Sequence, residues 1–330
     1  MDRQAPSRIL ITGFSGFVGS YLVEKCRERY PHAQLFGLGK HSPSHAISPI
    51  MQDVIPLLAD ITSPEMVRHA IAQAQPDLVF HLAGQASVAA SWTDPVQTLK
   101  VNAEGAVHLF EALRVEALSP RIVLVGSGEQ YGMIRPEENP VSEECLQRPI
   151  NPYAVSKAAQ DLYGYQYFFA YKLPIVRVRS FNHFGPRQAA MFVVPNFARQ
   201  IALIEAGKAE PVLLVGNLQA QRDFSPVEDV VDAYLAIAEH GQPGEAYNIG
   251  SGQARSISEI LHLLLSFTKI PISVRVDPAR VRPLDVTVLV ADTTRLRTHT
   301  DWKPAVDFEY ALRQTLDYWR ATVANEVRQK

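Results

Sequence analysis

The chain has 330 residues, of which 47% are hydrophobic and 20% are charged. This length and composition allow a large core to be buried, in one large α/β domain or in two unequal lobes, and they do not favour disorder. The formal net charge of −2 provides no basic field for nucleic acid, so we expect no nucleic-acid partner.

Cys26 and Cys145 are the two cysteines, and their spacing is not that of a metal site. We therefore expect free thiols, no bound metal and a cytoplasmic location. Residues 1–7 are polar and lack the apolar stretch of a signal peptide. The longest apolar runs, 122–125 and 212–215, are far shorter than the roughly 20 residues of a membrane span, so a soluble protein is predicted.

Short apolar segments alternate with amphipathic ones through the first half of the chain. Five segments are expected to be buried parallel strands: 8–12, 34–38, 54–58, 77–82 and 121–125. Helices are expected to begin near Gly16, Ser63, Asp94 and Asn151, with Ser63 as an N-cap followed by proline. This alternation predicts an α/β fold with a doubly wound parallel sheet.

The pattern changes after Arg179, where proline and glycine interrupt shorter segments, as at Gly185-Pro186 and Pro243-Gly244. We expect residues 1–180 to form the sheet domain. Residues 181–330 are expected to form mainly a smaller C-terminal lobe, with some chain crossing back. Two packed lobes predict a cleft between them, which is where a site is expected.

A glycine-rich turn follows the first expected strand and opens a helix. Glycines allow a tight turn and let backbone N–H groups approach a pyrophosphate at the positive end of the helix. The turn therefore predicts a Rossmann-type dinucleotide site, since its position between strand and helix is more specific than the glycines alone. Its cofactor-binding residues are expected to be Gly13, Gly16, Phe17, Val18 and Gly19.

The second expected strand ends at Leu38-Gly39-Lys40-His41, without the acid that would normally bind the ribose 2′-hydroxyl. The cation of Lys40 suits a 2′-phosphate and predicts NADP(H), with NAD(H) as the alternative. Lys40 as an ordinary surface lysine is the competing interpretation. Further cofactor contacts are expected where the next two strands end, at Asp60, Ile61, Leu82 and Ala83.

Tyr153 and Lys157 are four residues apart, which places them on one face of an expected helix. A neighbouring ammonium stabilises phenolate, so we expect Lys157 to lower the pKa of Tyr153 for proton transfer. This spacing is common by itself. With the glycine turn upstream and Ser127 at the end of a strand between them, the sequence resembles the extended short-chain dehydrogenase/reductase family, in its NAD-dependent epimerase/dehydratase group.

The resemblance runs through nearly the whole chain. It is carried by Thr12, Gly13, Gly16, Gly19, Asp60, His81-Leu82-Ala83, Asn102, Ser127, Tyr131-Gly132, Tyr153, Lys157, Arg179-Ser180-Phe181-Asn182-His183-Phe184-Gly185-Pro186, Arg222-Asp223-Phe224 and Arg282-Pro283. The segments 126–132, 181–183 and 216–218 look most like GDP-4-keto-6-deoxy-mannose reductases and GDP-mannose 4,6-dehydratases. A GDP-hexose is therefore the implied substrate.

The resemblance also implies residue roles. Ser127 would bind the oxygen at C4 of the sugar, Tyr153 would transfer its proton, and Lys157 would hold the nicotinamide ribose, with Asn102 also in the cofactor site. Two donors at that oxygen suit the negative charge that develops there. Asn182, Arg222 and Arg282 would hold the diphosphate, although Arg222 could instead pair with a neighbouring acid. Further substrate contacts are expected at Val193, Asn217 and Asp285.

Glu129 and Gly128 bear on the reaction. Glu129 stands where dehydratases carry the base for the C5 proton, but relatives that only reduce keep an acid here too. Gly128 has no side chain where dehydratases place a polar or acidic residue, which favours a reductase. The alternatives are a 4,6-dehydratase or epimerase and, less favoured, a non-catalytic NADP-binding regulator. His183 is expected to support the substrate loop.

The helix expected over 151–172 carries more aromatic residues than one buried stripe can hold. Related enzymes commonly pair through this helix and the segment 94–118, so the resemblance implies a homodimer. The competing interpretation is that these rings cover the second lobe.

Overall fold

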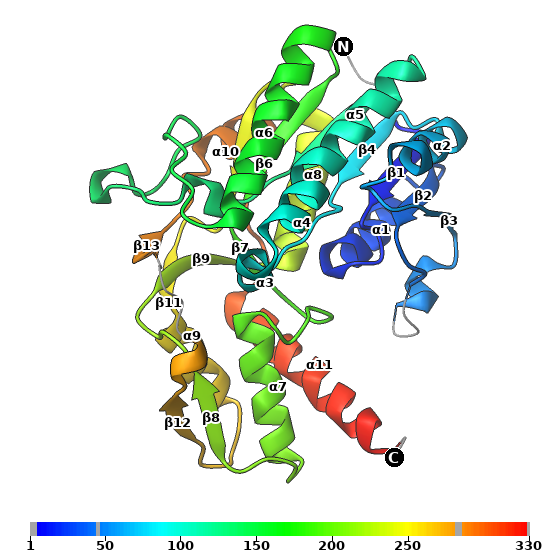
Figure 1. The fold of residues 1–330 in the computed structure, drawn as a ribbon. Helices are drawn as coiled ribbons and strands as arrows, with labels where there is room; N and C mark the ends of the chain where they lie inside the picture. The colour runs from blue at the N-terminus through cyan, green and yellow to red at the C-terminus, as the bar shows by residue number, and fades with distance from the viewer. Residues whose placement is uncertain (1–4, 44–46, 281–285, 329–330) are drawn as a thin grey trace.

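The computed structural model describes residues 5–43, 47–280 and 286–328. Its main feature is a seven-stranded parallel sheet (Figure 1). In spatial order its strands are β10(Ala246–Ile249), β6(Ile175–Ser180), β5(Arg121–Val125), β4(Leu78–His81), β1(Arg8–Thr12), β2(Gln34–Gly39) and β3(Val54–Leu58). Chain order runs outward from β1 in both directions, which confirms the doubly wound sheet.

Helices cover both faces of the sheet, because neighbouring residues of each strand point to opposite sides. Ile9 and Ile11 of β1 pack in a core with α1(Phe17–Arg29) and α8(Val227–His240). Leu10 packs on the other face, in a core with side chains of three further helices. These are α2(Pro64–Ala74), α5(Gly105–Val115) and α6(Pro152–Tyr171). Burial on both faces explains why the strands are continuously apolar.

Side-chain caps lie at three of the predicted helix starts of this domain. The Oγ of Ser63, the Oδ1 of Asp94 and the Oδ1 of Asn151 accept backbone N–H groups at the starts of α2, α4(Pro95–Leu99) and α6. The expected helix starts at these positions are confirmed. The sequence analysis missed the short α3(Val88–Thr93) and the π-helical turn Lys100–Glu104 that joins α4 to α5.

The second lobe is built on a separate core. Strand β9(Gln221–Pro226) pairs with β7(Asn182–Phe184), β11(Ala254–Ser256) and β13(Val288–Leu289), and β8(Val212–Val215) pairs with β12(Ser273–Val276). Around them pack α7(Val193–Glu205), α9(Ile257–Ser266) and α11(Phe308–Arg328). Figure 1 shows this lobe below the large sheet.

The chain returns to the large sheet after entering the second lobe. Strand β10 pairs with β6 at the sheet edge, and α8 packs beside α1 over one sheet face. Helix α10(Thr294–Thr300) packs against α8 and β10. Residues beyond 240 therefore help to close the core of the first lobe.

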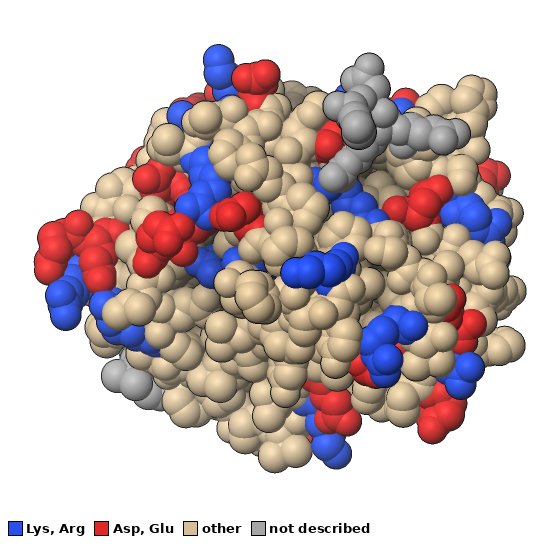
Figure 2. Space-filling view, turned by 90° about the horizontal axis from the view of Figure 1, so that it is seen from above, with Lys and Arg blue, Asp and Glu red and all other residues tan. Residues whose placement is uncertain are grey.

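Charged side chains are intermixed on the surface. Figure 2 shows acidic and basic residues interspersed with wide uncharged areas on the face viewed from above. Among the helices of the described residues, none combines the length and the apolar character needed to cross a bilayer.

Candidate active site

A cleft of about 1100 Å³ lies between the carboxyl ends of the large sheet and the second lobe. This is where an open parallel sheet binds its ligand. Its lining includes these predicted residues: Gly13, Gly16, Phe17, Val18, Gly19, Lys40, Asp60, Ile61, Leu82, Ala83, Ser127, Glu129, Tyr153, Lys157, Asn182, Val193, Asn217 and Arg222. Residues from distant parts of the sequence are thus brought together in one cleft.

Among the predicted residues that the structure describes, Asn102 does not line the cleft. Asn102 is fully buried in the π-helical turn, where its Oδ1 accepts the backbone N–H of Gln85 and its Nδ2 donates to the Oγ of Ser156. Asn102 therefore stabilises the cleft wall through Gln85, which lines the cleft. Arg282 and Asp285 lie outside the described residues.

The glycine turn is built for close backbone packing. Gly13 has a φ of +71°, and a Cβ on it would lie 3.0 Å from the backbone nitrogen of Ala83. A Cβ on Gly19 would lie 2.4 Å from the carbonyl oxygen of Gly13. Helix α1 begins at Phe17 with neither a side-chain cap nor an acid in its first turn. The first residues of this helix line the cleft, and free N–H groups at a helix start suit an anion, so the turn fits a dinucleotide pyrophosphate.

A buried contact joins β1 to β4 beneath this turn. The Thr12 hydroxyl accepts the N–H of Ala83 at 3.0 Å and lies 2.9 Å from Nδ1 of His81. Burial and the nearby charge of Lys157 lower the pKa of His81 to about 3. The imidazole is therefore neutral, and its hydrogen bond with Thr12 holds both strands together at the cofactor edge.

Lys40 and Asp60 form an ion pair in the cleft, with Nζ 3.0 Å from Oδ2. The pKa of Asp60 is lowered chiefly by hydrogen bonds from Thr62, and to a smaller extent by Lys40. The Lys40 side chain is 62% exposed. The sequence analysis treated these residues separately, because only the pairing of β2 with β3 brings them together.

The four predicted catalytic residues come from two elements. Ser127 caps the 3-10 helix Gly128–Tyr131 at the end of β5, and Glu129 lies in that helix. Tyr153 and Lys157 lie on α6, which is fixed at its start by the Asn151 cap. Only 8% of Ser127, 8% of Tyr153 and 5% of Lys157 is exposed, so most of each residue is enclosed by the fold.

Burial raises the pKa of Tyr153 to about 12, against the opposing effect of a hydrogen bond with Ser127. The expectation that Lys157 lowers this pKa is therefore wrong for this structure. The reason is that the Lys157 ammonium donates to the carbonyl oxygen of Val125 at 2.9 Å and to Oε1 of Gln160 at 2.8 Å. Tyr153 is a protonated phenol, ready to act as an acid.

Gly128 packs against the ring of Phe181, and a Cβ on Gly128 would lie 2.9 Å from Cδ2 of that ring. Phe181 is buried, so its ring fills the space that a side chain at position 128 would need. The neighbouring Glu129 faces the cleft and accepts a hydrogen bond from Nδ2 of Asn151 at 3.4 Å. The site thus has one carboxylate beside Ser127 and no second acid at position 128.

The second lobe completes the cleft with Asn182 from β7, Val193 from α7, Asn217 and Arg222. Arg222 is 6% exposed, and its Nη1 donates to the carbonyl oxygens of Gln221 and Val286. The adjacent Asp223 accepts hydrogen bonds from Ser251 and Gly252.

His183 and many residues that the sequence analysis did not select also line the cleft. The His183 ring stacks on Phe17, which agrees with a supporting role. The unselected residues include Trp92, Met191 and Arg280. Arg280 is two positions before the selected Arg282, so the sequence motif there already pointed to this segment as part of the site. Nothing in the sequence singled out Trp92 or Met191, because exposed apolar residues are common on surfaces.

Comparisons with known proteins place these features in a family. The profile of the GDP-mannose 4,6 dehydratase family matches residues 10–315. The chain is 34% identical to the GDP-6-deoxy-D-mannose reductase of Pseudomonas aeruginosa, over 97% of this chain and 99% of that protein. It is 32% identical to GDP-mannose 4,6 dehydratase 2 of Arabidopsis thaliana, over 93% and 85%.

Solved structures agree. The structure of RMD from Pseudomonas aeruginosa complexed with NADPH superposes with a TM-score of 0.82 at 32% identity, covering 96% of this chain and all of that one. The UDP-glucose 4-epimerase of Thermus thermophilus in complex with NAD gives 0.84 at 30% identity, covering 95% and 99%. The chain therefore belongs to the GDP-mannose 4,6 dehydratase family of extended short-chain dehydrogenases/reductases.

Proposed function

We propose that this chain is an NADPH-dependent reductase of the C4 keto group of a GDP-4-keto-6-deoxyhexose. Support comes from the reductase relative, which matches over nearly the full length of both chains, and from the similar structure that holds NADPH. The cleft contains a phenol acid, a hydroxyl and an ammonium, which suit carbonyl reduction.

The packing of Phe181 on Gly128 is the observation that favours reduction over dehydration. Dehydration needs a proton donor at the C6 hydroxyl and a base at C5, whereas reduction needs only a proton donor at the C4 oxygen. Glu129 supplies a base, but the space beside it is filled by an aromatic ring. A 4,6-dehydratase is the second candidate, and the presence of Glu129 in the cleft is what favours it.

Each catalytic residue is given a role by this proposal. The turn at Gly13 and α1 would hold the pyrophosphate of NADPH, which would supply the hydride for C4. Ser127 and Tyr153 donate hydrogen bonds to the C4 oxygen, and Tyr153 gives its proton as that oxygen becomes a hydroxyl. Lys157 donates to the nicotinamide ribose.

The proposed substrate contacts are in the second lobe. Asn182 and Arg222 would hold the diphosphate, and Val193 and Asn217 would contact the nucleoside and sugar. Arg282 and Asp285 keep the substrate role that the resemblance implies. We also propose that residues 1–180 form the sheet domain, that residues 181–330 form mainly the smaller lobe, and that the protein is cytoplasmic.

The first test compares two substrates. GDP-4-keto-6-deoxymannose should be reduced with one NADPH oxidised for each product, measured by nicotinamide absorbance, while GDP-mannose alone should not react. Glu129→Gln should lower the reductase rate only modestly, because the neutral isostere keeps the hydrogen bonds. If GDP-mannose instead yields a 4-keto-6-deoxy product without net NADPH consumption, and Glu129→Gln stops it, the enzyme is a dehydratase.

Lys40→Ala should weaken NADPH binding about tenfold or more, because a charged hydrogen bond to the 2′-phosphate is worth about 1.5–3 kcal/mol. The variant also leaves the Asp60 carboxylate without its partner, which repels the phosphate. NADH affinity should barely change. Titration calorimetry with both cofactors measures this, with the exposed Lys208→Ala as control. Equal weakening of both cofactors would disprove the role of Lys40.

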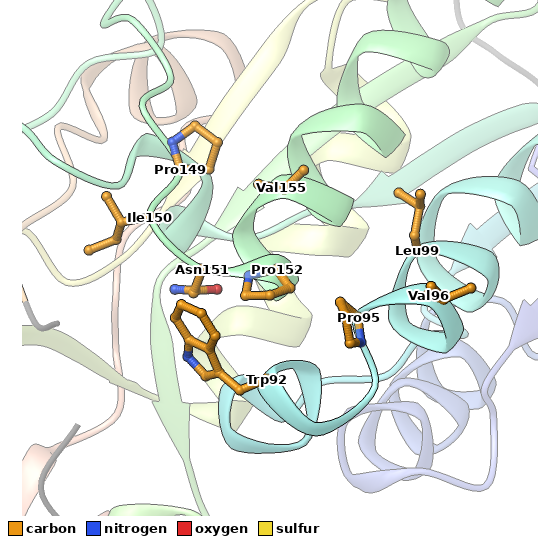
Figure 3. Close-up of a pocket in the computed structure, with 9 residues that line it drawn as sticks. All are labelled: Trp92, Pro95, Val96, Leu99, Pro149, Ile150, Asn151, Pro152 and Val155. Carbon is orange, nitrogen blue, oxygen red and sulfur yellow. The ribbon is translucent and has the colours of Figure 1, made fainter. Parts of the chain in front are cut away.

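We further propose a homodimer formed through α6 and its neighbours. An apolar groove is lined by residues of α3, α4 and the start of α6 (Figure 3): Trp92, Pro95, Val96, Leu99, Pro149, Ile150, Asn151, Pro152 and Val155. Leu162 and Phe169 follow Val155 at seven-residue intervals on α6, which places them on the same side of the helix, and they are 61% and 66% exposed. The α6 rings at Tyr163 and Tyr165 are also exposed, so they do not cover the second lobe.

Sedimentation velocity tests the dimer. Wild type should sediment as a dimer at micromolar concentration, and Phe169→Glu should sediment as a monomer, because a charge would be buried against apolar groups. Tyr310→Glu on α11, which is 58% exposed there, is the matched control and should leave the dimer intact. A monomeric wild-type protein would overturn the proposal.

A further inference from the structure

Among the described residues, the Lys157 ammonium has two protein partners, the carbonyl oxygen of Val125 at 2.9 Å and Oε1 of Gln160 at 2.8 Å. An ammonium has three N–H donors, so two are used by these acceptors. Lys157 lines the cleft, and the third donor is left for a ligand there.

Gln160 lies one turn beyond Lys157 on α6 and is fully buried. Its Oε1 accepts from the ammonium, while its Nε2 is buried without a hydrogen-bond partner in the described part of the chain. Flipping the amide would not help, since it would turn two N–H donors toward a cation. Burying an amide N–H without a partner is unfavourable, so the hydrogen bond to Lys157 is the contact that explains a glutamine at position 160.

The groups around Lys157 leave its charge without a carboxylate partner among the described residues. His81 of β4 is neutral, and Tyr153 on the same helix is a phenol. Glu129, on the neighbouring 3-10 helix, hydrogen-bonds Asn151. Asp161, next to Gln160, is held by Arg177 and Arg179. The ammonium is therefore stabilised by neutral dipoles.

We propose that Gln160 is a positioning residue, which fixes the Lys157 ammonium through Oε1 and leaves its third N–H directed to the ligand cleft. This rests on the proposed function, since that function gives Lys157 its task. A neutral acceptor holds the ammonium in place without the strong stabilisation of charge that a carboxylate would add.

Gln160→Glu is a specific probe because the atom it replaces, Nε2, makes no hydrogen bond in the described structure. Burial lowers the pKa of Lys157 to about 8. A carboxylate at hydrogen-bond distance should raise this pKa by about one to three units, whereas Gln160→Met removes an acceptor and should lower it. Lysine is charged below its pKa, so the ammonium should persist to higher pH in Gln160→Glu and be lost at lower pH in Gln160→Met.

The decisive measurement is an NMR titration of labelled lysine side chains in protein stripped of nucleotide, with the Lys157 signal assigned by its loss in Lys157→Met. We expect opposite shifts of the Lys157 midpoint in the two Gln160 variants. Gln73→Glu, an exposed position on α2, makes the same charge change at a distance and should leave the midpoint unchanged. A folded Gln160→Glu or Gln160→Met protein with the wild-type midpoint would overturn the proposal.

The pH dependence of kcat/KM gives the second readout. Loss of activity at alkaline pH should move with the Lys157 midpoint, upward in Gln160→Glu and downward in Gln160→Met. The midpoints could shift as expected while neither wild type nor the variants reduce the keto sugar. In that case the proposed reaction is wrong and the positioning role stands. If the enzyme is active but neither variant changes the alkaline pH at which kcat/KM falls, the positioning role is wrong.

Discussion

Replacing Tyr153 with phenylalanine is expected to lower kcat for reduction of the keto sugar by about 10²–10⁴, the usual contribution of a positioned proton donor. Burial raises the pKa of this phenol to about 12, so it carries its proton throughout the neutral range and can give it to the C4 oxygen. Phenylalanine lacks the hydroxyl that donates this proton and keeps the rest of the ring. The measurement is single-turnover oxidation of NADPH with saturating substrate.

NADPH affinity is the internal control for this variant. Tyr153 is only 8% exposed, so its ring is expected to stay in place in Tyr153→Phe and the dissociation constant should change little. Lys157→Met should differ by losing both rate and cofactor affinity. A Tyr153→Phe enzyme within a few-fold of the wild-type kcat would contradict the assigned role.

Asp161→Ala is expected to reduce the free energy of unfolding by about 3–5 kcal/mol, the usual cost of breaking a buried ion pair from one side. The Asp161 carboxylate is 1% exposed and lies 2.8 Å from Nη1 of Arg177 and 3.2 Å from Nη2 of Arg179. Removing it leaves two guanidiniums of β6 without their counter-ion. Urea unfolding measures the loss. Asp317→Ala breaks an exposed ion pair and should cost less than about 1 kcal/mol.

The same ion pairs predict a dependence on pH. Burial raises the pKa of Asp161, but the charges of Arg179 and Arg177 outweigh burial and lower it. A carboxyl whose folded pKa is depressed contributes stability above its unfolded pKa, near 3.9, and loses it as pH falls through the folded value. Wild type should therefore lose stability more steeply than Asp161→Ala in acid. Parallel pH profiles would show that the carboxylate is not the group responsible.

Much of the first lobe could be predicted because its signals are local. A parallel strand buried on both faces is a continuous apolar run, and capping residues such as Ser63 and Asn151 mark helix starts in the sequence itself. The glycine turn and the pair Tyr153 and Lys157 lie at fixed spacings. They occupy the same cleft because strand ends and helix starts meet at one edge of the sheet.

The remaining features depend on contacts between distant residues. Lys40 meets Asp60 only through strand pairing, and Phe181 fills the space at Gly128 from more than fifty residues away. The pKa of Tyr153 depends on burial and on where the Lys157 ammonium points, which no spacing reveals. Gln160 was overlooked because a glutamine three residues after a lysine has no signature of its own.

The late return of α8 and β10 to the large sheet has a consequence during synthesis of the chain. Until residues 227–249 have left the ribosome, the apolar face that α8 covers and the edge of β6 that pairs with β10 have no partner. Nascent chains of about 180 residues therefore present an uncovered apolar face and an open strand edge, both of which promote aggregation. The first lobe therefore cannot close its core until residues 227–249 have been translated.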